Sequence, residues 1–156
     1  MIEASLKRDY PDRPLLGVGA VIVRNEQVLV VRRANPPLKG EWSIPGGLVE
    51  TGETTREALV REIREETGLT VEPVEFIEVF ERILHDADSR VQYHFVVIDY
   101  LCRIISGESC PGSDVSEMRW ATFDDLQILG ITPETRGVIR KGLNAAKKST
   151  AFRTRS

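Results

Sequence analysis

The chain is poor in the residue types that mark secreted, membrane-embedded or zinc-binding proteins. It has only two cysteines, Cys102 and Cys110, in 156 residues, so we expect reduced thiols and neither a disulfide nor a zinc site. Residues 1–14 contain no apolar stretch of the kind that a secretory signal needs. No apolar run approaches the roughly 18 residues of a transmembrane helix. We therefore predict a cytoplasmic protein without a membrane span.

An excess of positive charge is also missing. Lysine and arginine number 21 against 24 aspartates and glutamates, which gives a formal net charge of −3. General nucleic-acid binders carry a basic surface, so this balance argues against that class of protein. A small anionic substrate is still compatible with it, because a bound metal ion would supply positive charge locally.

Length and local patterns predict one domain of the α/β class. We expect an N-terminal arm at residues 1–14, the domain at 15–146 and a basic tail at 147–156. Strands before and after a central helix, with helices from Asp124 and Pro133, predict an α/β layered sandwich with a mixed sheet. The segments with strand patterns are residues 15–23, 27–33, 42–45, 74–84, 91–105 and 118–123.

The central helix is predicted by residues 46–69, which read GGLVETGETTREALVREIREETGL. Thr54 and Glu57 form a capping box, and Gly68 suits the residue that follows a helix C-terminus. We therefore expect a helix from about Thr55 to Thr67, with a Gly-Gly turn before it.

Three carboxylates share one arc of this helix, because Glu62, Glu65 and Glu66 stand at spacings i, i+3 and i+4. Leu59 and Ile63 occupy the adjoining arc and should face the core. Like charges this close repel, and a hard divalent cation such as Mg²⁺ or Mn²⁺ would reverse the sign of that interaction. The alternative is a solvated acidic face, whose charge the neighbouring arginines partly offset.

The wider spacing of this segment resembles the signature of the Nudix family, whose members hydrolyse nucleoside diphosphates linked to another group. The resemblance implies an α/β/α sandwich with a mixed β-sheet and a metal-dependent hydrolase. It also implies that Glu53 and Arg61 form an ion pair that ties the loop to the helix. The residues that match the signature are Gly47, Glu53, Arg61, Glu62, Ile63, Glu65, Glu66, Gly68 and Leu69.

The same resemblance implies a ligand set for Mg²⁺ or Mn²⁺. Glu62 and Glu66 would be the principal metal ligands, and Glu65 would be a further one, direct or through water. The backbone carbonyl of Gly46 would join them, and a glycine suits a backbone that approaches a metal ion closely.

A general base is expected from a loop beyond the helix, where the resembled family often places it. The segment ESCPGSDVSEMRW offers Asp114 and Glu117 as the first candidates, since a carboxylate there need only reach the attacking water. Glu65 is the competing candidate from within the helix. The alternative for both loop residues is that they are plain surface acids.

Residues outside the signature supply candidates for substrate binding. Arg32 and Arg33 end a predicted strand and could bind phosphate, or they could be ordinary strand-end charges. Trp42 could stack on a base, although its place just before Ile44 favours packing in the core. Three further candidates lie at the facing ends of two predicted strands and could line a base or ribose pocket: Phe80, Arg82 and Tyr93.

Three stretches outside the signature resemble the ADP-ribose pyrophosphatase branch: RRANPPLKGEWSIPGG, HFVVIDYLCR and SDVSEMRW. The resemblance implies that water splits ADP-ribose into AMP and ribose 5-phosphate. The expected partners are this small nucleoside diphosphate and, as in that branch, a second copy in a homodimer.

Other activities stay open at this point. One is hydrolysis of damaged (d)NTPs to release pyrophosphate. Another is removal of pyrophosphate from RNA 5′ ends, which the acidic balance of the chain disfavours. A sensor that binds nucleotide sugars without catalysis is an alternative of a different class, and the intact signature argues against it.

Overall fold

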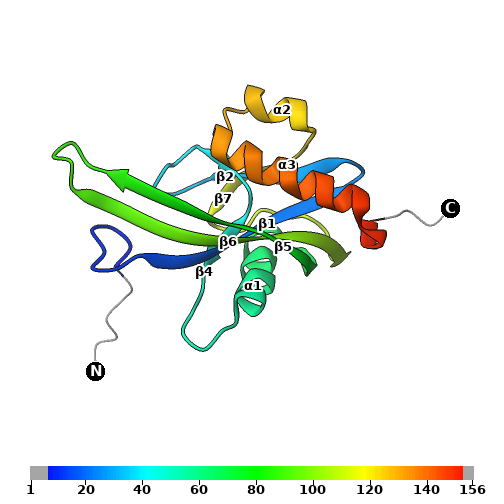
Figure 1. The fold of residues 1–156 in the computed structure, drawn as a ribbon, viewed down its shortest axis with the longest axis horizontal. Helices are drawn as coiled ribbons and strands as arrows, with labels where there is room; N and C mark the ends of the chain where they lie inside the picture. Colours follow the sequence, from blue (N-terminus) through cyan, green and yellow to red (C-terminus); the bar gives the residue numbers. More distant parts are fainter. Residues whose placement is uncertain (1–6, 153–156) are drawn as a thin grey trace.

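The structure, a computed structural model, describes residues 7–152 (Figure 1). Within this range the helices are α1 (Thr55–Thr67), α2 (Phe123–Ile128) and α3 (Pro133–Lys148), followed by a 3₁₀ turn, η1 (Thr150–Phe152). The strands are β1 (Leu15–Arg24), β2 (Gln27–Arg33), β3 (Trp42–Ser43), β4 (Gly46–Leu48), β5 (Thr70–His85), β6 (Val91–Ser106) and β7 (Val115–Ala121).

Strand β1 lies at the centre of the sheet and pairs with three other strands. It runs parallel to β6 over residues 15–22 and antiparallel to β4 over residues 17–19. Its last residues form the predicted hairpin with β2. The strand order is β3-β2-β1-β6-β5, with β4 beside β1 and β7 beside β2. The predicted mixed sheet is therefore confirmed.

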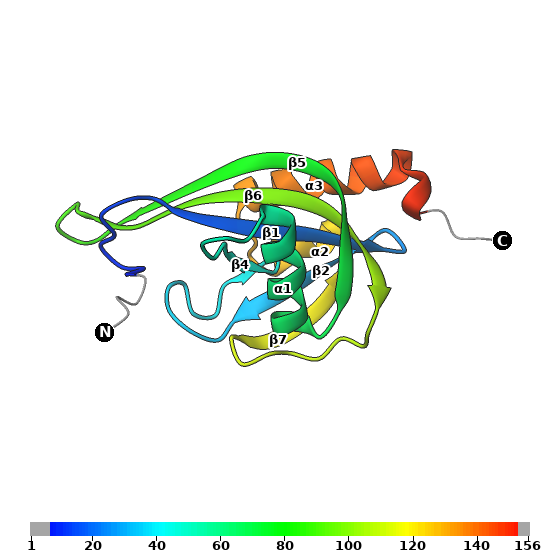
Figure 2. The same cartoon turned by 90° about the horizontal axis from the view of Figure 1, so that it is seen from below.

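Helices cover both faces of this sheet, which confirms the predicted α/β/α arrangement (Figures 1 and 2). Alternate residues of a strand point to opposite faces. Val18 and Ala20 of β1 therefore pack with Ile63 of α1. Val21 and Val23 pack on the other face, against α2 and α3.

Helix α1 begins and ends where the sequence predicts. The Thr54 hydroxyl accepts a hydrogen bond from the Glu57 N–H at 3.1 Å, and the Glu57 carboxylate accepts one from the Thr54 N–H at 3.3 Å. Gly68 follows the helix with φ of 75°, a left-handed conformation that glycine adopts without strain. Leu59 and Ile63 on the inner face of the helix are fully buried, as expected.

The predicted turn at Gly46 and Gly47 is wrong, because both residues lie in β4 and pair with β1. The strand predicted at residues 42–45 is also too long, because β3 ends at Ser43. Glycine is a poor strand former, so the local pattern favoured a turn. Close packing against β1 explains why a glycine occupies this strand position, because a Cβ atom at Gly46 would overlap the backbone carbonyl of Val18.

Two other strands differ from the prediction by more than one residue. Strand β5 begins at Thr70, ahead of Pro73, which is tolerated because β5 lies at the edge of the sheet. Strand β7 covers Val115–Ala121 instead of residues 118–123, and Phe123 begins α2.

Strands β5 and β6 form a long hairpin that extends well past the other strands (Figure 1). The N-terminal arm contacts this hairpin, since the Tyr10 hydroxyl donates a hydrogen bond to Asp86 at 2.7 Å. Residues 1–6 of that arm and the end of the predicted tail lie outside the described residues. Helix α3 continues to Lys148.

None of the helices between residues 7 and 152 combines the length and hydropathy needed to span a bilayer.

Candidate active site

A cavity of about 620 Å³ lies among β1, β4, helix α1 and the loop at residues 34–41. Carboxylates of α1 form one part of its wall. Apolar side chains of β5, β6 and α3 form another part. A cavity of this size and mixed lining suits a small molecule that has both a charged and an apolar portion.

The glycines of β4 allow the carboxylates of α1 to approach the backbone of the sheet. A Cβ atom at Gly47 would overlap the carboxylate of Glu62. The Glu62 side chain is only 17% exposed, and burial raises its pKa even though Arg61 beside it favours the anion. Glu65, one turn further along, is 60% exposed and lies at the rim of the cavity.

Gly46 presents its peptide groups to the site. It faces Gly19 of β1, and the ladder hydrogen bond beside this pair runs from the Ala20 N–H to the Pro45 carbonyl at 2.9 Å. In this register the N–H and carbonyl of Gly46 both point away from β1. The N–H donates to Glu66 Oε2 at 3.1 Å, so the carbonyl oxygen is turned to the same side of the strand.

Glu66 is a buried carboxyl group with a strongly shifted pKa. Burial raises this pKa to about 8, and the charges of Glu62 and Asp114 act in the same direction. The hydrogen bond from Gly46 opposes the shift but does not overcome it. A cation placed beside Glu66 would stabilise its ionised form.

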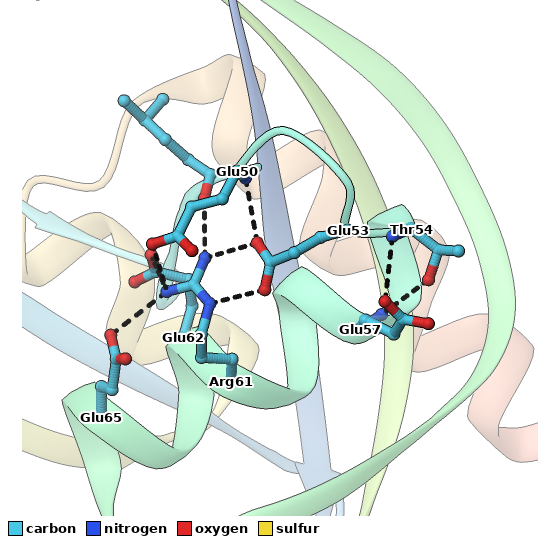
Figure 3. A network of polar contacts seen from close by, with 8 residues as sticks. Glu50, Glu53, Thr54, Glu57, Arg61, Glu62 and Glu65 are labelled. Carbon is cyan, nitrogen blue, oxygen red and sulfur yellow. Dashed lines mark hydrogen bonds and ion pairs between the residues drawn. The ribbon is translucent and has the colours of Figure 1, made fainter. Parts of the chain in front are cut away.

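Arg61 holds the loop before α1 against the helix (Figure 3). Its Nε and Nη2 atoms donate to Glu53 at 2.7 and 2.8 Å, and Nη2 also donates to the Leu48 carbonyl at 3.1 Å. Its Nη1 atom donates to Glu62 at 2.9 Å and to Glu65 at 3.3 Å. The guanidinium lowers the pKa of Glu53 to about 2, chiefly through these hydrogen bonds.

Oxygen atoms of the kind that a hard cation binds line this end of the cavity. Among residues 7–152, no three acidic, histidine or cysteine side chains already converge on one point. Mg²⁺ needs fewer, because it commonly takes one or two carboxylates and fills its other positions with water and phosphate oxygens. Glu62 and Glu66, with the outward carbonyl of Gly46, fit that requirement.

The two loop acids predicted as general bases are placed differently. Asp114 lines the cavity, and its Oδ1 atom accepts a hydrogen bond from Asn35 at 3.0 Å. Glu117 lies outside the cavity lining and pairs with Arg32 at 3.1 Å on the surface. Only Asp114 therefore faces the same space as the α1 carboxylates.

Three of the residues predicted to bind substrate line the cavity: Arg33, Phe80 and Arg82. The Arg33 Nε atom donates to the Pro37 carbonyl at 2.6 Å. Arg82 donates to both carboxylate oxygens of Glu41, at 2.8 and 3.2 Å. Each arginine is therefore oriented by a second group.

The other three predicted substrate residues, Arg32, Trp42 and Tyr93, lie outside the cavity lining. Arg32 donates to the Gly40 carbonyl at 3.0 Å in addition to its ion pair. Trp42 is 9% exposed and packs in the core on the α3 side of the sheet. Tyr93 stacks on Phe95, with ring centroids 6.1 Å apart. These placements favour packing and surface roles.

The cavity also contains residues that the sequence pattern did not single out. Among them are Arg8, Asn35, Phe95 and Asp99. Asp99 carried a recognisable signal, because it is the one charged residue in the apolar run FVVIDYLC. A lone acid in a predicted buried strand is unusual enough to mark a site.

Most of the chain matches the sequence model of a known protein family. Residues 13–142 match the NUDIX domain family. The chain belongs to the Nudix family. Nudix hydrolases act on small nucleotide substrates and generally use divalent metal ions, so the predicted class of enzyme is confirmed.

Relatives of this Nudix hydrolase differ in the substrates for which they are named. An ADP-ribose pyrophosphatase of Methanocaldococcus jannaschii is 36% identical over 121 residues, which cover 78% of this chain and 69% of the relative. A Mycobacterium tuberculosis protein that carries the name of an 8-oxo-dGTP diphosphatase is 36% identical over 123 residues, which cover 78% and 83%. The solved structure of a MutT Nudix hydrolase from Burkholderia pseudomallei is 31% identical and superposes with a TM-score of 0.69 over 85% of this chain and 98% of its own.

The Arg61 network predicts a loss of stability in acid. The pKa of Glu53 falls from 4.5 to about 2 on folding, so the folded chain binds fewer protons than the unfolded chain between these values. The stabilisation is therefore present above pH 4.5 and is lost as the pH falls toward 2. Glu53→Gln should be less stable than the wild type at pH 7, and the difference should shrink between pH 5 and pH 3. Urea denaturation at a series of pH values measures this.

Glu50→Gln is the matched control, because Glu50 lies 3.8 Å from the same guanidinium and its side chain is 69% exposed. An exposed pair at this distance contributes little, so this variant should differ from the wild type by a small amount at every pH. A Glu53→Gln difference that stays constant from pH 7 to pH 3 would contradict the assignment.

Proposed function

We propose that this Nudix hydrolase uses Mg²⁺ or Mn²⁺ to cleave ADP-ribose into AMP and ribose 5-phosphate. The observation that carries the proposal is a single cavity lined both by Glu62 and Glu66 and by apolar side chains of β5 and β6. The carboxylate part would take the diphosphate, and the apolar part would take a nucleoside. The ADP-ribose pyrophosphatase of M. jannaschii, a relative of this chain, supports the choice of substrate.

Glu62, Glu66 and the carbonyl of Gly46 would hold the metal, with Glu65 as a further ligand at the rim. A bound ion would polarise the diphosphate, stabilise the charge that develops on its oxygens and lower the pKa of water. Because Glu62 and Glu66 are largely buried, their attraction to a cation is less screened than it would be in water.

Arginines around the same cavity complement an anionic substrate. Arg8, Arg33 and Arg82 all line it. A guanidinium can donate two parallel hydrogen bonds to phosphate oxygens, which fixes orientation as well as adding attraction. Arg82 is already held by Glu41, so little side-chain entropy would be lost when it binds the substrate.

Asp114 is the best placed general base. It lines the cavity, and its negative charge raises the pKa of Glu66, so the two carboxyl groups share one space. Asp114 would accept a proton from the attacking water as the water oxygen bonds to phosphorus and the bridging P–O bond breaks. Asn35 would orient the carboxylate through the hydrogen bond to its Oδ1 atom.

Hydrolysis of damaged (d)NTPs is the second candidate function. The M. tuberculosis relative, named for 8-oxo-dGTP diphosphatase activity, favours it. The same carboxylates and arginines would serve both reactions, because the bond that breaks is a phosphoanhydride in each. The difference must lie in the groups that contact the rest of the substrate.

A substrate panel tests the proposal. ADP-ribose, other sugar nucleotides, dinucleoside polyphosphates and dNTPs, including 8-oxo-dGTP, would be assayed with Mg²⁺ and with Mn²⁺, and the products identified by chromatography. We expect the highest kcat/KM for ADP-ribose, with AMP and ribose 5-phosphate as products. A highest kcat/KM for a dNTP with release of pyrophosphate would support the second candidate. Tight binding without hydrolysis of any compound would support a sensor.

The assignment of the base predicts a contrast between two loop variants. Asp114→Asn removes the proton acceptor but keeps an oxygen that can bind Asn35, so the fold should be preserved. We expect kcat to fall by about 10²-fold or more. Glu117→Gln breaks only the surface pair with Arg32, so its kcat should stay close to that of the wild type. Steady-state kinetics on the best substrate measure both, and the reverse order of effects would move the base to Glu117.

A further inference from the structure

Asp99 of β6 is a buried acid that the proposed reaction does not use. The residue is 2% exposed, and its Oδ1 atom has no hydrogen-bond partner within residues 7–152. Burial raises the pKa of Asp99 to about 7, with a further contribution from the charge of Glu78. A buried polar atom without a partner costs stability, so its presence needs a reason.

The side chains beside Asp99 do not supply the missing partner. Glu78 faces it across the β5–β6 ladder but is itself acidic, and it pairs with Lys141 of α3 at 3.1 Å. On the opposite side stands Gly19 of β1, where a Cβ atom would overlap Asp99 Oδ1 and crowd the methyl end of Ile44. The absence of a side chain at Gly19 leaves room for this carboxyl group.

Asp99 lies instead in the lining of the active-site cavity. Alternate residues of a strand share a face, so Asp99, Val97 and Phe95 form a row on β6. In the ladder, Val97 is paired with Phe80 of β5, and Phe95 is paired with Arg82. All five residues line the cavity, so Asp99 is the one acidic side chain in a row that otherwise consists of apolar side chains and Arg82.

The chemistry of this wall fits a nucleobase better than a sugar. A base has two flat apolar faces, which can contact Phe80, Phe95 and Val97, and a polar edge that needs only a few hydrogen bonds. A ribose ring presents several hydroxyl groups and would need a polar partner for each. The single acceptor in the wall matches one donor on the edge of a base.

We propose that Asp99 sets the base specificity of this enzyme by accepting a hydrogen bond from an amino group of the nucleobase. The proposal rests on the proposed function in that it assumes a nucleotide substrate. A carboxyl group keeps an acceptor oxygen whether or not it is protonated. Since the base is remote from the reacting phosphorus, loss of this contact should raise KM and leave kcat nearly unchanged.

Binding of two nucleotides that differ by one amino group tests the proposal. AMP carries the 6-amino group, and purine riboside 5′-monophosphate lacks it. By titration calorimetry, the wild type should prefer AMP by about tenfold. Asp99→Leu should bind both nucleotides equally, and Asp99→Asn, which keeps one acceptor oxygen, should retain part of the preference. The melting temperature of Asp99→Leu should not fall below that of the wild type, because the variant loses an unpaired buried carboxyl group.

Glu78→Gln is the control, because Glu78 lies next to Asp99 but outside the cavity lining. It should keep the preference for AMP. A preference that survives in Asp99→Leu, an equal loss of affinity for both nucleotides, or no binding of either nucleotide by the wild type would overturn the proposal. If the wild type prefers AMP through Asp99 but does not hydrolyse ADP-ribose, the proposed function fails and the role of Asp99 stands.

Discussion

Helix α1 contacts the sheet through the glycines of β4, and the rest of the site depends on how close this contact is. Gly47 leaves space for the carboxylate of Glu62, and Gly46 donates its N–H to Glu66. A side chain at Gly47 would occupy the space of the carboxylate and displace Glu62 from its position in the site. The cap at one end of α1 and the buried Ile63 on its inner face fix the position and rotation of the helix. Both carboxylates therefore face the cavity from a rigid element, which is where a catalytic group is best placed.

Groups that are costly to bury gather around this contact and around the cavity. Burial raises the pKa of Glu66 to about 8 and that of Asp99 to about 7. Arg61 offsets part of the cost, since it neutralises Glu62 while tying Glu53 to the helix. Strongly shifted pKa values from burial and charge partners are typical of functional sites, because a bound ligand or cation supplies the missing partner. Under the proposed function, the end of the cavity at α1 would act on the diphosphate, and the end at Asp99 would select the group attached to it.

The sequence predicted the part of the site that is local in the chain. Helix α1 and its ends follow from Thr54, Glu57 and the left-handed residue after the helix, all within a few positions of one another. The strand at Gly46 was missed, because glycine disfavours strands locally and only the contact with β1 and α1 explains it there. Phe80, which the sequence places at a possible base or ribose pocket, lies in the cavity wall, whereas an apolar neighbour such as Phe95 becomes visible only through the register of β5 and β6. Pairings between distant strands are not encoded in any short pattern.

Metal binding at the α1 carboxylates can be measured by titration with Mn²⁺, followed by electron paramagnetic resonance of the free ion. Glu66→Gln keeps the shape of the side chain but cannot ionise beside a cation, so we expect a folded variant with at least about tenfold weaker Mn²⁺ binding and no metal-dependent turnover. Glu75→Gln, at an exposed position of β5, should bind Mn²⁺ like the wild type. Mn²⁺ affinity and turnover of Glu66→Gln equal to those of the wild type would show that Glu66 does not hold the metal.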